Sequence, residues 1–599
     1  MRILSALALL SWSSVVRARG SPEPNPPTWP ESVSVFTPDS DPAEIQKKVE
    51  AAFAMNGNDP ADSSMCNNGQ FSNERFAFMF TPGTYKTDVP VGFYTSVYGL
   101  GESPTDTNFV GGKGVYAENG CGWFQVGALD TFWRSAENFH TSSAFAWAVG
   151  TGMTWAVSQA APLRNVKVDN DLLFFEYVTG DAAGYASGGW ASGIEVGGTV
   201  SFGSQQQFAV RSSSASAFDM PVWNGVFAGV DGAPAPQCGS EGNPSISVES
   251  EVPLIAEKPF ITYVEDGGKF NLVVPGVESD TSGVAKPMKN ATVVPFESVY
   301  VTDPSDTAAI INAKLAEGLH IVVTPGVYEL EDSLEIKQEN QVVLGLGFAT
   351  LIAPSSGRPC VKVGDVGGVR VAGLLLEAGP WETTGGMLQI GETGKFEGSA
   401  ANPIVLSDVF ARVGGPTTGV GPVDTMFNVQ SGFTVVDNTW LWRADHTDGN
   451  GGDDVLVKNS DNPVKNGIVV NADDVFAYGL AAEHTTEDNV VWNGDRGTTF
   501  FYQAEIMYDY MEDEWPHSCY RIGEGVKDHK ATGLGCYSYF RDHAGSCAHG
   551  VDTGGGNFNI DKAVSVWLNG VDGSSIKNVV NNDGLVAEAE NPHQFYCSA

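Results

Sequence analysis

Basic residues are scarce in this sequence of 599 residues. Lys and Arg together number 33, against 72 for Asp and Glu, so the formal net charge is −39. A field of this sign repels nucleic acid and anionic membranes. It also disfavours polyanionic substrates such as pectate or alginate, although a basic pocket or bound Ca²⁺ would invert it locally. The composition therefore predicts a neutral substrate, with no nucleic-acid partner and no membrane partner.

Long apolar runs and metal-binding spacings are missing as well. Beyond the N-terminal residues, no stretch reaches the ~18 uninterrupted apolar residues that a membrane-spanning helix needs. No Cys-x-x-Cys or His-rich spacing indicates a zinc site. The scattered Gly doublets lack the strand-to-helix setting of a phosphate loop. We therefore expect a protein that uses neither a metal nor a cofactor.

The N-terminus has the pattern of a signal peptide. Residues 1–20 combine a basic start, a short apolar run and small residues toward Gly20, which predicts a secreted, extracellular protein; an ordinary buried element is the alternative. We expect a monomer. Asn290 begins an Asn-Ala-Thr sequon, a glycan acceptor in a eukaryotic source. In an exported chain eight cysteines predict disulfides, at most four, among Cys66, Cys121, Cys238, Cys360, Cys519, Cys536, Cys547 and Cys597.

An internal repeat organises the chain. Residues 31–35 read Glu-Ser-Val-Ser-Val and residues 297–301 read Glu-Ser-Val-Tyr-Val, each followed by Asp-Pro and a helical pattern. A Thr-Pro-Gly-x-Tyr segment then ends at Tyr85 or Tyr328, and a Gly-Leu-Gly at Gly101 or Gly347. Three landmarks in the same order indicate two copies of one domain plan. We assign residues 21–240 to the first domain, 241–295 to the connection and 296–599 to the second domain.

Both copies have an all-β pattern. Short apolar, β-branched runs alternate with Gly, Asn and Asp, as in Ile404-Val-Leu and Ile468-Val-Val. A spacing of about 20–25 residues between equivalent runs favours a right-handed parallel β-helix of the pectate-lyase type over a sandwich. The helix that opens each copy is expected to cap the exposed end of its solenoid. A β-propeller is the alternative, but the sequence has no four-strand blade repeat.

Two glutamates, Glu483 and Glu505, stand 22 residues apart in apolar and aromatic surroundings. This separation is about one solenoid turn, and adjacent parallel strands lie about 4.8 Å apart. If both side chains point to the same face, the two carboxyl groups are neighbours and the pKa of one rises. A carboxyl protonated near neutral pH is the general acid that a glycosidase needs. The alternative is a pair of solvated residues on an acidic surface.

Other polar sets compete with this pair. One is Asp445 with His446 and Asp448, another is Asp473 with Asp474, and the acidic residues between 509 and 514 have the pattern of a solvated charge run. The run from Arg541 to His543 lacks a nearby nucleophile and is interpreted as structural. Several aromatic side chains are candidates to stack on sugar rings, with core packing equally expected for each: Trp440, Trp442, Trp492, Tyr502 and Tyr508.

Three segments carry a family resemblance. The first runs from Trp155 through Gln159 to Val166. The second is Ser187-Gly-Gly-Trp, followed by residues 203–211. The third joins Glu483-His484 to Gln503-Ala-Glu505. Together with the duplicated domain openings, they resemble glycoside hydrolase family 55, secreted enzymes of two tandem parallel β-helices that hydrolyse β-1,3-glucan with inversion. The likeness spans most of the chain, although its continuous matches are short.

The resemblance implies a role for each matching residue. Glu505 corresponds to the general acid, Glu483 to its partner around the attacking water, and Gln159 and Ser187 to side chains that hold this water. The site is then expected in the cleft between the two solenoids, with exo action on a β-glucan chain. The implied substrate-binding residues are Trp492, Tyr502, Gln503, Tyr508, His484 and Trp442.

The sequence also departs from the family pattern. Ala482 and Ala504 replace Ser and Thr, and two residues intervene before Tyr508. Carboxyl groups one coil apart are closer than the about 6.5–9.5 Å of a usual inverting pair, so we expect polar side chains to share the role of the base. Two alternatives stay open: a polysaccharide lyase using Ca²⁺ and a basic residue, and a non-catalytic cell-wall or adhesion protein that binds carbohydrate.

Overall fold

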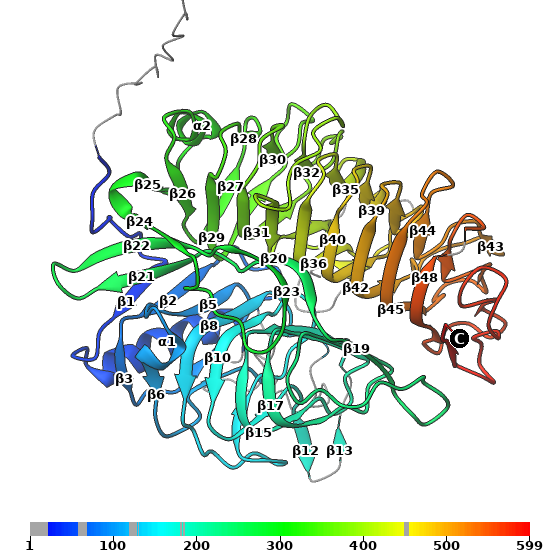
Figure 1. The fold of residues 1–599 in the computed structure, drawn as a ribbon, viewed down its shortest axis with the longest axis horizontal. Helices are drawn as coiled ribbons and strands as arrows, with labels where there is room; N and C mark the ends of the chain where they lie inside the picture. The colour runs from blue at the N-terminus through cyan, green and yellow to red at the C-terminus, as the bar shows by residue number, and fades with distance from the viewer. Residues whose placement is uncertain are drawn as a thin grey trace, which may run out of the picture.

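The computed structural model describes residues 22–57, 69–118, 129, 131–179, 182–183, 186–417, 419–447, 455–459, 461–556 and 558–598. The predictions for the signal peptide at residues 1–20, for Cys66, for Cys121 and for Asp448 lie outside these residues. Within them the chain forms two large parallel β-structures, which lie side by side (Figure 1). The all-β prediction of two tandem β-helices is confirmed.

The first β-helix is built on a 15-stranded sheet whose main path has parallel pairing throughout. This path comprises β1 (Val33–Phe36), β2 (Phe76–Phe80), β5 (Thr95–Gly99), β8 (Arg134–Thr141), β10 (Leu163–Val168), β14 (Gly189–Ser192), β16 (Gln207–Arg211), β18 (Asn224–Ala228) and β19 (Ser245–Glu249). Off this path the sheet includes β3 (Gly83–Tyr85), β6 (Thr107–Phe109), β9 (Gly152–Thr154), β11 (Asp171–Leu173), β15 (Glu195–Ser201) and β17 (Ser214–Asp219). Two separate two-stranded sheets pair β4 (Val89–Pro90) with β7 (Val115–Tyr116) and β12 (Tyr177–Thr179) with β13 (Ala182–Ala183), and η1 (Pro104–Asp106) is a 3₁₀ turn.

The connection between the two β-helices is antiparallel. It contains β20 (Val252–Ala256), β21 (Phe260–Val264), β22 (Lys269–Val274), β23 (Val277–Thr281) and β24 (Thr292–Pro295), followed by η2 (Phe296–Ser298). Because β19 still pairs with β18, the first sheet extends to Glu249, nine residues beyond the expected boundary at 240.

The second β-helix has two long parallel sheets. The 13-stranded sheet comprises β25 (Val299–Val301), β26 (His320–Val323), β27 (Val327–Glu329), β29 (Val342–Ile352), β31 (Arg370–Glu377), β33 (Ile404–Ser407), β34 (Phe410–Val413), β36 (Thr434–Arg443), β40 (Phe476–Glu483), β42 (Gly497–Glu505), β45 (His529–Ser538), β48 (Asn559–Trp567) and the antiparallel β50 (His593–Tyr596). The 8-stranded sheet comprises β28 (Leu334–Ile336), β30 (Val361–Val363), β32 (Leu388–Ile390), β35 (Val423–Val429), β39 (Val464–Val470), β41 (Val490–Trp492), β44 (Tyr520–Ile522) and β47 (Val551–Asp552). Short strands are β37 (His446–Thr447), β38 (Val455–Leu456), β43 (Glu514–Trp515), β46 (Ser546–Cys547) and β49 (Ser575–Ile576).

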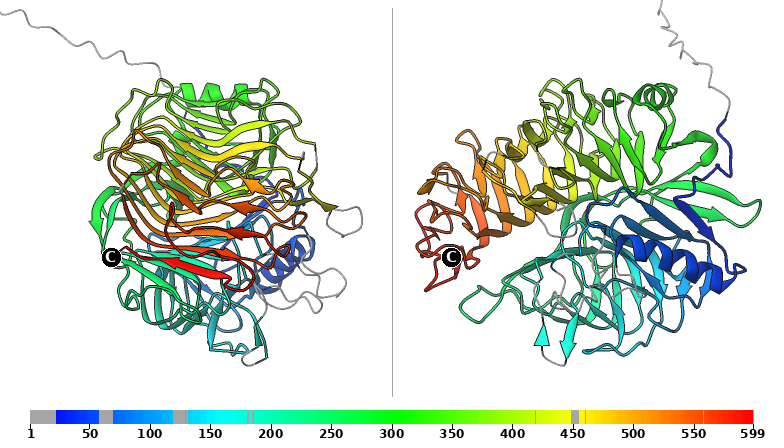
Figure 2. Two further views of the ribbon diagram at one scale, coloured as in Figure 1. Left: turned by 90° about the vertical axis from the view of Figure 1, so that its right-hand side faces the viewer. Right: turned by 180° about the vertical axis from the view of Figure 1, so that it is seen from behind.

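Each copy opens with the expected helix. In α1 (Pro42–Asn56) the Asp41 side chain caps the N-terminus, and in α2 (Ala308–Ala316) Thr307 does so, so each satisfies a backbone N–H that has no partner within the helix. Helix α2 covers the first coil of the second β-helix beside β26 and β28, and α1 lies against the first β-helix near β4 (Figure 2).

Side-chain alternation separates two kinds of apolar packing. Inward-facing residues fill the interior of each solenoid, for example Leu480 and Ala482 of β40. Residues of the opposite phase pack between the two β-helices, where Tyr94 and Trp133 of the first meet Trp440 of the second. Successive side chains of a strand point to opposite faces, so one strand serves both the solenoid core and the interface.

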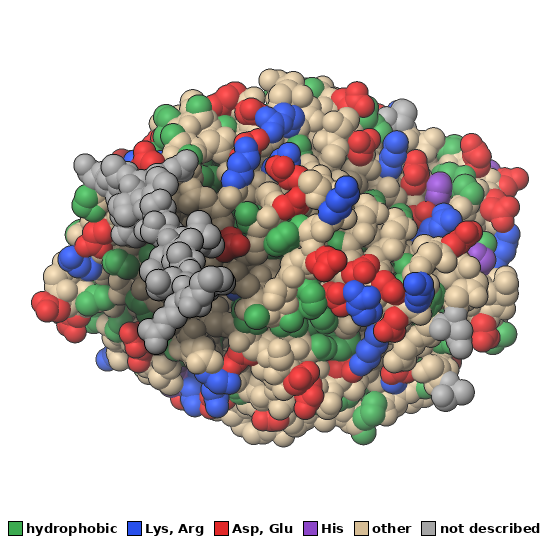
Figure 3. Space-filling model, turned by 45° about the horizontal axis from the view of Figure 1, so that its top comes forward, with side chains coloured by type: hydrophobic (Ala, Val, Ile, Leu, Met, Phe, Trp, Pro, Cys, Tyr) green, Lys and Arg blue, Asp and Glu red, His purple; other side chains and the backbone are tan. Residues whose placement is uncertain are grey.

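Disulfide bonds support the prediction made from the cysteines. Cys238, in the first half of the chain, is bonded to Cys597 near the C-terminus, and Cys519 is bonded to Cys536. Cys360 and Cys547 are buried and free. In the part of the chain that the structure describes, no helix is long and apolar enough to cross a membrane. Acidic side chains are spread over the face shown in Figure 3, in places beside Lys and Arg.

Candidate active site

The two glutamates are neighbours in the 13-stranded sheet. Glu483 ends β40, Glu505 ends β42, and the two residues are partners in the parallel pairing of these strands. The prediction that they lie one coil apart is confirmed. Ala482 and Ala504 point into the solenoid core, so alternation directs both carboxyl groups outward, toward the first β-helix. Both glutamates are buried.

Glu483 is held by donors from both β-helices. The Gln159 Nε2 group donates to Glu483 Oε1 at 3.0 Å, and Trp440 Nε1 donates to Oε2 at 2.8 Å. Ser187 Oγ donates to Gln159 Oε1 at 2.6 Å, which fixes the orientation of that amide. The structure thus brings together the predicted residues Gln159, Ser187 and Glu483, although the first two precede the third by about 300 residues in the sequence.

Glu505 has different neighbours. The Tyr508 hydroxyl donates a hydrogen bond to Glu505 Oε2. His484 Nε2 lies 3.9 Å from this oxygen and 4.0 Å from Glu483 Oε2, and its ring packs edge-on against Tyr508. His484 has a φ of 62°, a backbone conformation uncommon outside glycine. This turn at the end of β40 directs the imidazole toward both carboxyl groups.

Burial determines the protonation of the site. It raises the pKa of Glu505 to about 7, with a further increase from the Asp445 charge and a decrease from the Tyr508 hydrogen bond. Burial, and then the charge of Glu505, also raises the pKa of Glu483 well above its ordinary value. Burial lowers the pKa of His484 to about 4, so its imidazole is neutral near pH 7. Two adjacent buried carboxyl groups of this kind share a proton.

The structure contradicts the prediction that Trp492 and Tyr502 bind substrate. Trp492 and Tyr502 are fully buried in the interior core of the second β-helix, and the Tyr502 hydroxyl bonds the carbonyl of Cys519. Side chains inside the solenoid cannot contact a bound sugar. Trp442, in contrast, is the strand partner of Glu483 on β36, with its ring 5.3 Å from that of Trp440.

The competing acidic sets are paired elsewhere. Asp473 and Asp474 form surface ion pairs with Arg496, and Asp509 forms a buried ion pair with Arg443. Asp445 lies beside His446 and contributes charge to the site.

Sequence reasoning missed Tyr537. This residue is the strand partner of Glu505 on β45; it is fully buried, and among the residues that the structure describes its hydroxyl has no hydrogen-bond partner. Tyr537 lies one coil beyond Glu505 and on the same strand face as both glutamates, so the coil spacing could have located it at the site. We add it to the candidate site.

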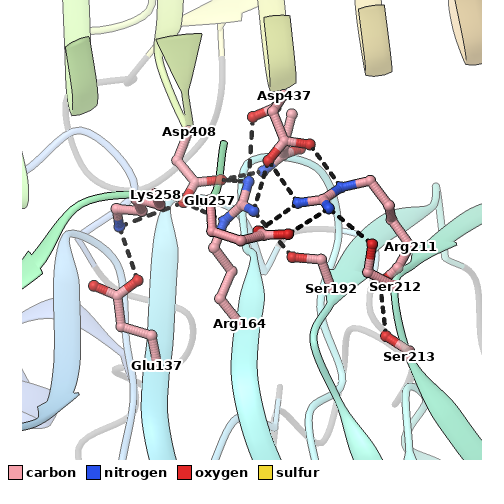
Figure 4. Close-up of polar contacts among 11 residues, drawn as sticks. Glu137, Arg164, Ser192, Arg211, Ser212, Ser213, Glu257, Lys258, Asp408 and Asp437 are labelled. Carbon is pink, nitrogen blue, oxygen red and sulfur yellow. Dashed lines mark hydrogen bonds and ion pairs between the residues drawn. The ribbon is translucent and has the colours of Figure 1, made fainter. Parts of the chain in front are cut away.

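A buried ionic cluster joins the two β-helices next to this site (Figure 4). Arg164 of β10 pairs with Asp408 at 2.7 Å and with Asp437 of β36 at 2.8 Å. Arg211 pairs with Asp437 and Glu257, and Lys258 with Glu137 and Asp408. Asp437 lies three residues before Trp440, so the cluster fixes the strand that carries a donor to Glu483.

Two parallel β-helices that enclose a buried carboxyl pair define a glycoside hydrolase on a pectate-lyase-like scaffold. The sequence model of the LAM55 pectate lyase-like domain matches residues 299–505. A protein named exo-beta-1,3-glucanase from Streptomyces sp. (strain SirexAA-E / ActE) is 39% identical over 519 residues, which cover 85% of this chain and 79% of the relative. The chain belongs to the LAM55 family, glycoside hydrolase family 55.

Solved structures agree with this assignment. The structure of sacteLam55A from Streptomyces sp. SirexAA-E is 34% identical, has a TM-score of 0.84, and the match covers 96% of this chain and 99% of that one. A second structure, of a variant of the same protein in complex with glucose, has the same identity and TM-score, with 97% and 100% coverage.

Proposed function

We propose that this protein is a secreted exo-acting hydrolase of β-1,3-glucan that inverts the anomeric configuration. The observation that carries the proposal is the buried pair of Glu483 and Glu505, with the pKa of Glu505 near 7. The name of the Streptomyces relative and the glucose bound to its variant support the substrate class. The disulfides support secretion, because such bonds persist in oxidising compartments.

Glu505 acts as the general acid in this mechanism. It gives its proton to the glycosidic oxygen as the bond from that oxygen to the anomeric carbon breaks. A water held by Glu483, Gln159 and Ser187 attacks the anomeric carbon from the face opposite the leaving oxygen. This water loses a proton to the side chains that hold it. One glycosidic bond and one water are consumed, and glucose leaves with inverted configuration.

The short distance between the carboxyl groups explains why the base is shared. Neighbouring parallel strands are about 4.8 Å apart, whereas inverting carboxyl pairs are commonly about 6.5–9.5 Å apart. Glu483 therefore cannot face Glu505 across a sugar ring as a separate base does. The Gln159 amide, which already bonds Glu483, extends the polar surface around the water toward the first β-helix.

A neutral sugar suits the remaining contacts. Tyr508 and His484 lie against Glu505, and Trp442 lies in the same row as both glutamates. Tyr508 and His484 are the proposed sugar contacts, whereas Trp442 is only 2% exposed and its ring stacks on Trp440 and Phe71. A net charge of −39 disfavours uronic acids in such a site.

Hydrolysis of laminarin by the Glu505→Gln variant tests the proposal. Glucose release is expected to fall by a factor of about 10²–10⁴, because glutamine cannot donate the proton. The matched control is Glu512→Gln on the surface, which should retain full activity. NMR of the first product should show the α-anomer. Full activity of Glu505→Gln, or unsaturated products typical of a lyase, contradicts the proposal.

A further inference from the structure

The glycan acceptor found in the sequence lies on the surface of the connection between the two β-helices. Asn290-Ala291-Thr292 is the only Asn-x-Ser/Thr triplet of the 599 residues in which the middle residue is not proline. Asn290 and Thr292 are both exposed. The triplet at Asn243 has Pro244 in the middle, which excludes it as an acceptor. The chain thus has one complete acceptor triplet, and the fold leaves it open to solvent.

The backbone at Asn290 suits a modified asparagine. Its φ is 56°, in the left-handed region where asparagine is enriched among the side chains other than glycine. A bond from Lys289 N to Lys286 O, 2.9 Å long, closes the turn before it. Gly276 packs against this turn, and a Cβ atom there would lie 2.7 Å from the Asn290 carbonyl oxygen. Among the described residues the Asn290 side chain has no hydrogen-bond partner, so a glycan on it breaks no contact.

The acceptor directly precedes an exposed strand edge. β24 is an outer strand of the three-stranded antiparallel sheet, and within the part of the chain that the structure describes it pairs only with β22 (Figure 1). Val293 in this strand is 47% exposed. The other outer strand, β21, is held against the first β-helix, because Tyr263 N donates to Leu100 O at 2.8 Å. β24 is therefore the free edge of this sheet.

A free edge of this composition favours association between chains. Thr and Val have high β propensity, and the unpaired N–H and C=O groups of an edge strand can pair with a strand of another molecule. Proteins protect such edges with charge, proline or a covering element. β24 reads Thr-Val-Val-Pro, so it ends in Pro295 but contains no charged residue. A bulky, hydrophilic group next to Thr292 would complete the protection.

We propose that Asn290 carries an N-linked oligosaccharide that covers the free edge of β24 when the chain passes through a eukaryotic secretory pathway. The transfer forms a bond from Asn290 Nδ2 to the anomeric carbon of the first sugar. The bond from that carbon to the pyrophosphate oxygen of a lipid-linked oligosaccharide breaks. The amide loses one proton, and the lipid pyrophosphate leaves with the electron pair of the broken bond.

This inference rests on the secretion in the proposed function and is independent of the proposed hydrolysis. None of the residues assigned above to the candidate active site belongs to β24 or to the turn at Asn290. The kcat on laminarin should therefore stay within about twofold whether or not the glycan is present.

Secretion of the full chain from a eukaryotic host tests the modification. Mass spectrometry of the peptide that contains Asn290 should show the oligosaccharide, and its enzymatic release should convert Asn290 to aspartate. Thr292→Ala removes the acceptor triplet, whereas Thr292→Ser preserves it and is the matched control. We expect the glycan in the unsubstituted protein and in Thr292→Ser, and its complete loss in Thr292→Ala. Asn243 should be unmodified in all three proteins.

The association of the purified protein tests the protection of β24. Light scattering at equal protein concentration should show association about fivefold faster for Thr292→Ala than for Thr292→Ser. Enzymatic removal of the glycan from the folded, unsubstituted protein should have the same effect. This second comparison holds even if Thr292→Ala fails to fold.

The outcomes separate this inference from the proposed function. Secreted, active protein with an unmodified Asn290 overturns the inference and leaves the proposed hydrolysis standing. A glycan whose removal does not change the rate of association contradicts its role at β24. A glycosylated protein that associates faster without its glycan but does not hydrolyse laminarin supports the inference and contradicts the proposed hydrolysis.

Discussion

Glu483 and Glu505 occupy the same position on adjacent parallel strands, so the backbone pairing of β40 with β42 sets the distance between their carboxyl groups. Side-chain movement changes this distance little, because both carboxyl groups are buried and hydrogen-bonded. The backbone hydrogen bonds of the sheet thus hold two carboxyl groups together in a site where only one proton is needed.

The pH dependence should report the protonation of Glu505. Its pKa near 7 predicts that kcat falls as the pH rises above about 7, since the general acid must be protonated. The Tyr508 hydrogen bond lowers this pKa, so Tyr508→Phe is expected to move the alkaline limb to higher pH. Laminarin hydrolysis from pH 4 to 9 measures the shift.

One control variant separates this effect from damage to the site. Tyr510→Phe removes a nearby phenol that bonds the backbone of Glu514 instead, and its profile should match that of the unsubstituted protein. A Tyr508→Phe limb that stays in place or moves to lower pH contradicts the assignment of Glu505 as the titrating acid.

Stability should vary with pH through the same group. The folded pKa of Glu505 is about 7 and its ordinary value is 4.5, so the folded state binds the extra proton between these values. Stability is therefore lost as the pH rises from about 4.5 to about 7. A shift of this size corresponds to roughly 3 kcal/mol. We expect Glu505→Gln to be more stable than the unsubstituted protein at pH 8, by up to about this amount, and equally stable near pH 4.5.

Urea unfolding at the two pH values measures this difference. The Glu512→Gln variant is the control, since Glu512 is exposed and its replacement should alter neither value. Equal stability of Glu505→Gln and the unsubstituted protein at pH 8 would show that burial of this carboxyl costs nothing in the folded state.

The sequence carried the information for the coil spacing. The 22 residues between Glu483 and Glu505 match one solenoid turn, because apolar and turn residues recur at that interval and strand pairing follows them. The same alternation that directs Glu505 outward places Tyr502, three residues earlier, on the inner face. Tyr502 could thus have been excluded as a sugar contact. Trp492 belongs to the other sheet, so phase alone could not locate its side chain.

Contacts between the two β-helices could not be read from the sequence. Arg164 and Asp437 are 273 residues apart, and nothing in their local sequence identifies the partner. The same holds for Gln159 and Glu483, which the family resemblance, and not residue spacing, related to one site. The packing of the two solenoids is set by many side chains at once, and no repeat in the sequence reports it.

The protein should lose stability when one charged side chain of the buried ionic cluster is removed. Arg164 lies between Asp408 and Asp437 with all three side chains buried. Arg164→Met leaves Asp408 with Lys258 and Asp437 with Arg211 as their remaining cations. The buried cluster then carries additional uncompensated negative charge, which is expected to reduce the free energy of unfolding by about 3–5 kcal/mol. Arg358→Met is the control, because Arg358 is 40% exposed in its pair with Asp332 and such pairs contribute at most about 1 kcal/mol. Urea unfolding compares the two.

A second substitution tests whether uncompensated charge is the cause. Arg164→Met combined with Asp408→Asn also removes one of the carboxylates that lost a cation, so part of the lost stability should return. A double variant that is as unstable as the sum of the single changes would attribute the loss to packing instead.

The disulfide between Cys238 and Cys597 should stabilise the arrangement of the two β-helices. It closes a separation of 359 residues and joins the end of the first β-helix to the C-terminal segment of the second. A cross-link over so long a loop restricts the unfolded chain, and removing a disulfide typically costs about 2–5 kcal/mol. Replacing both cysteines by serine should lower the midpoint of urea unfolding, while kcat on laminarin stays unchanged because neither residue lies at the site. Reductant should lower the midpoint of the unsubstituted protein more than that of the serine variant, since the variant has only its remaining disulfides to lose. Equal midpoints for the two oxidised proteins would show that noncovalent contacts between the β-helices are sufficient.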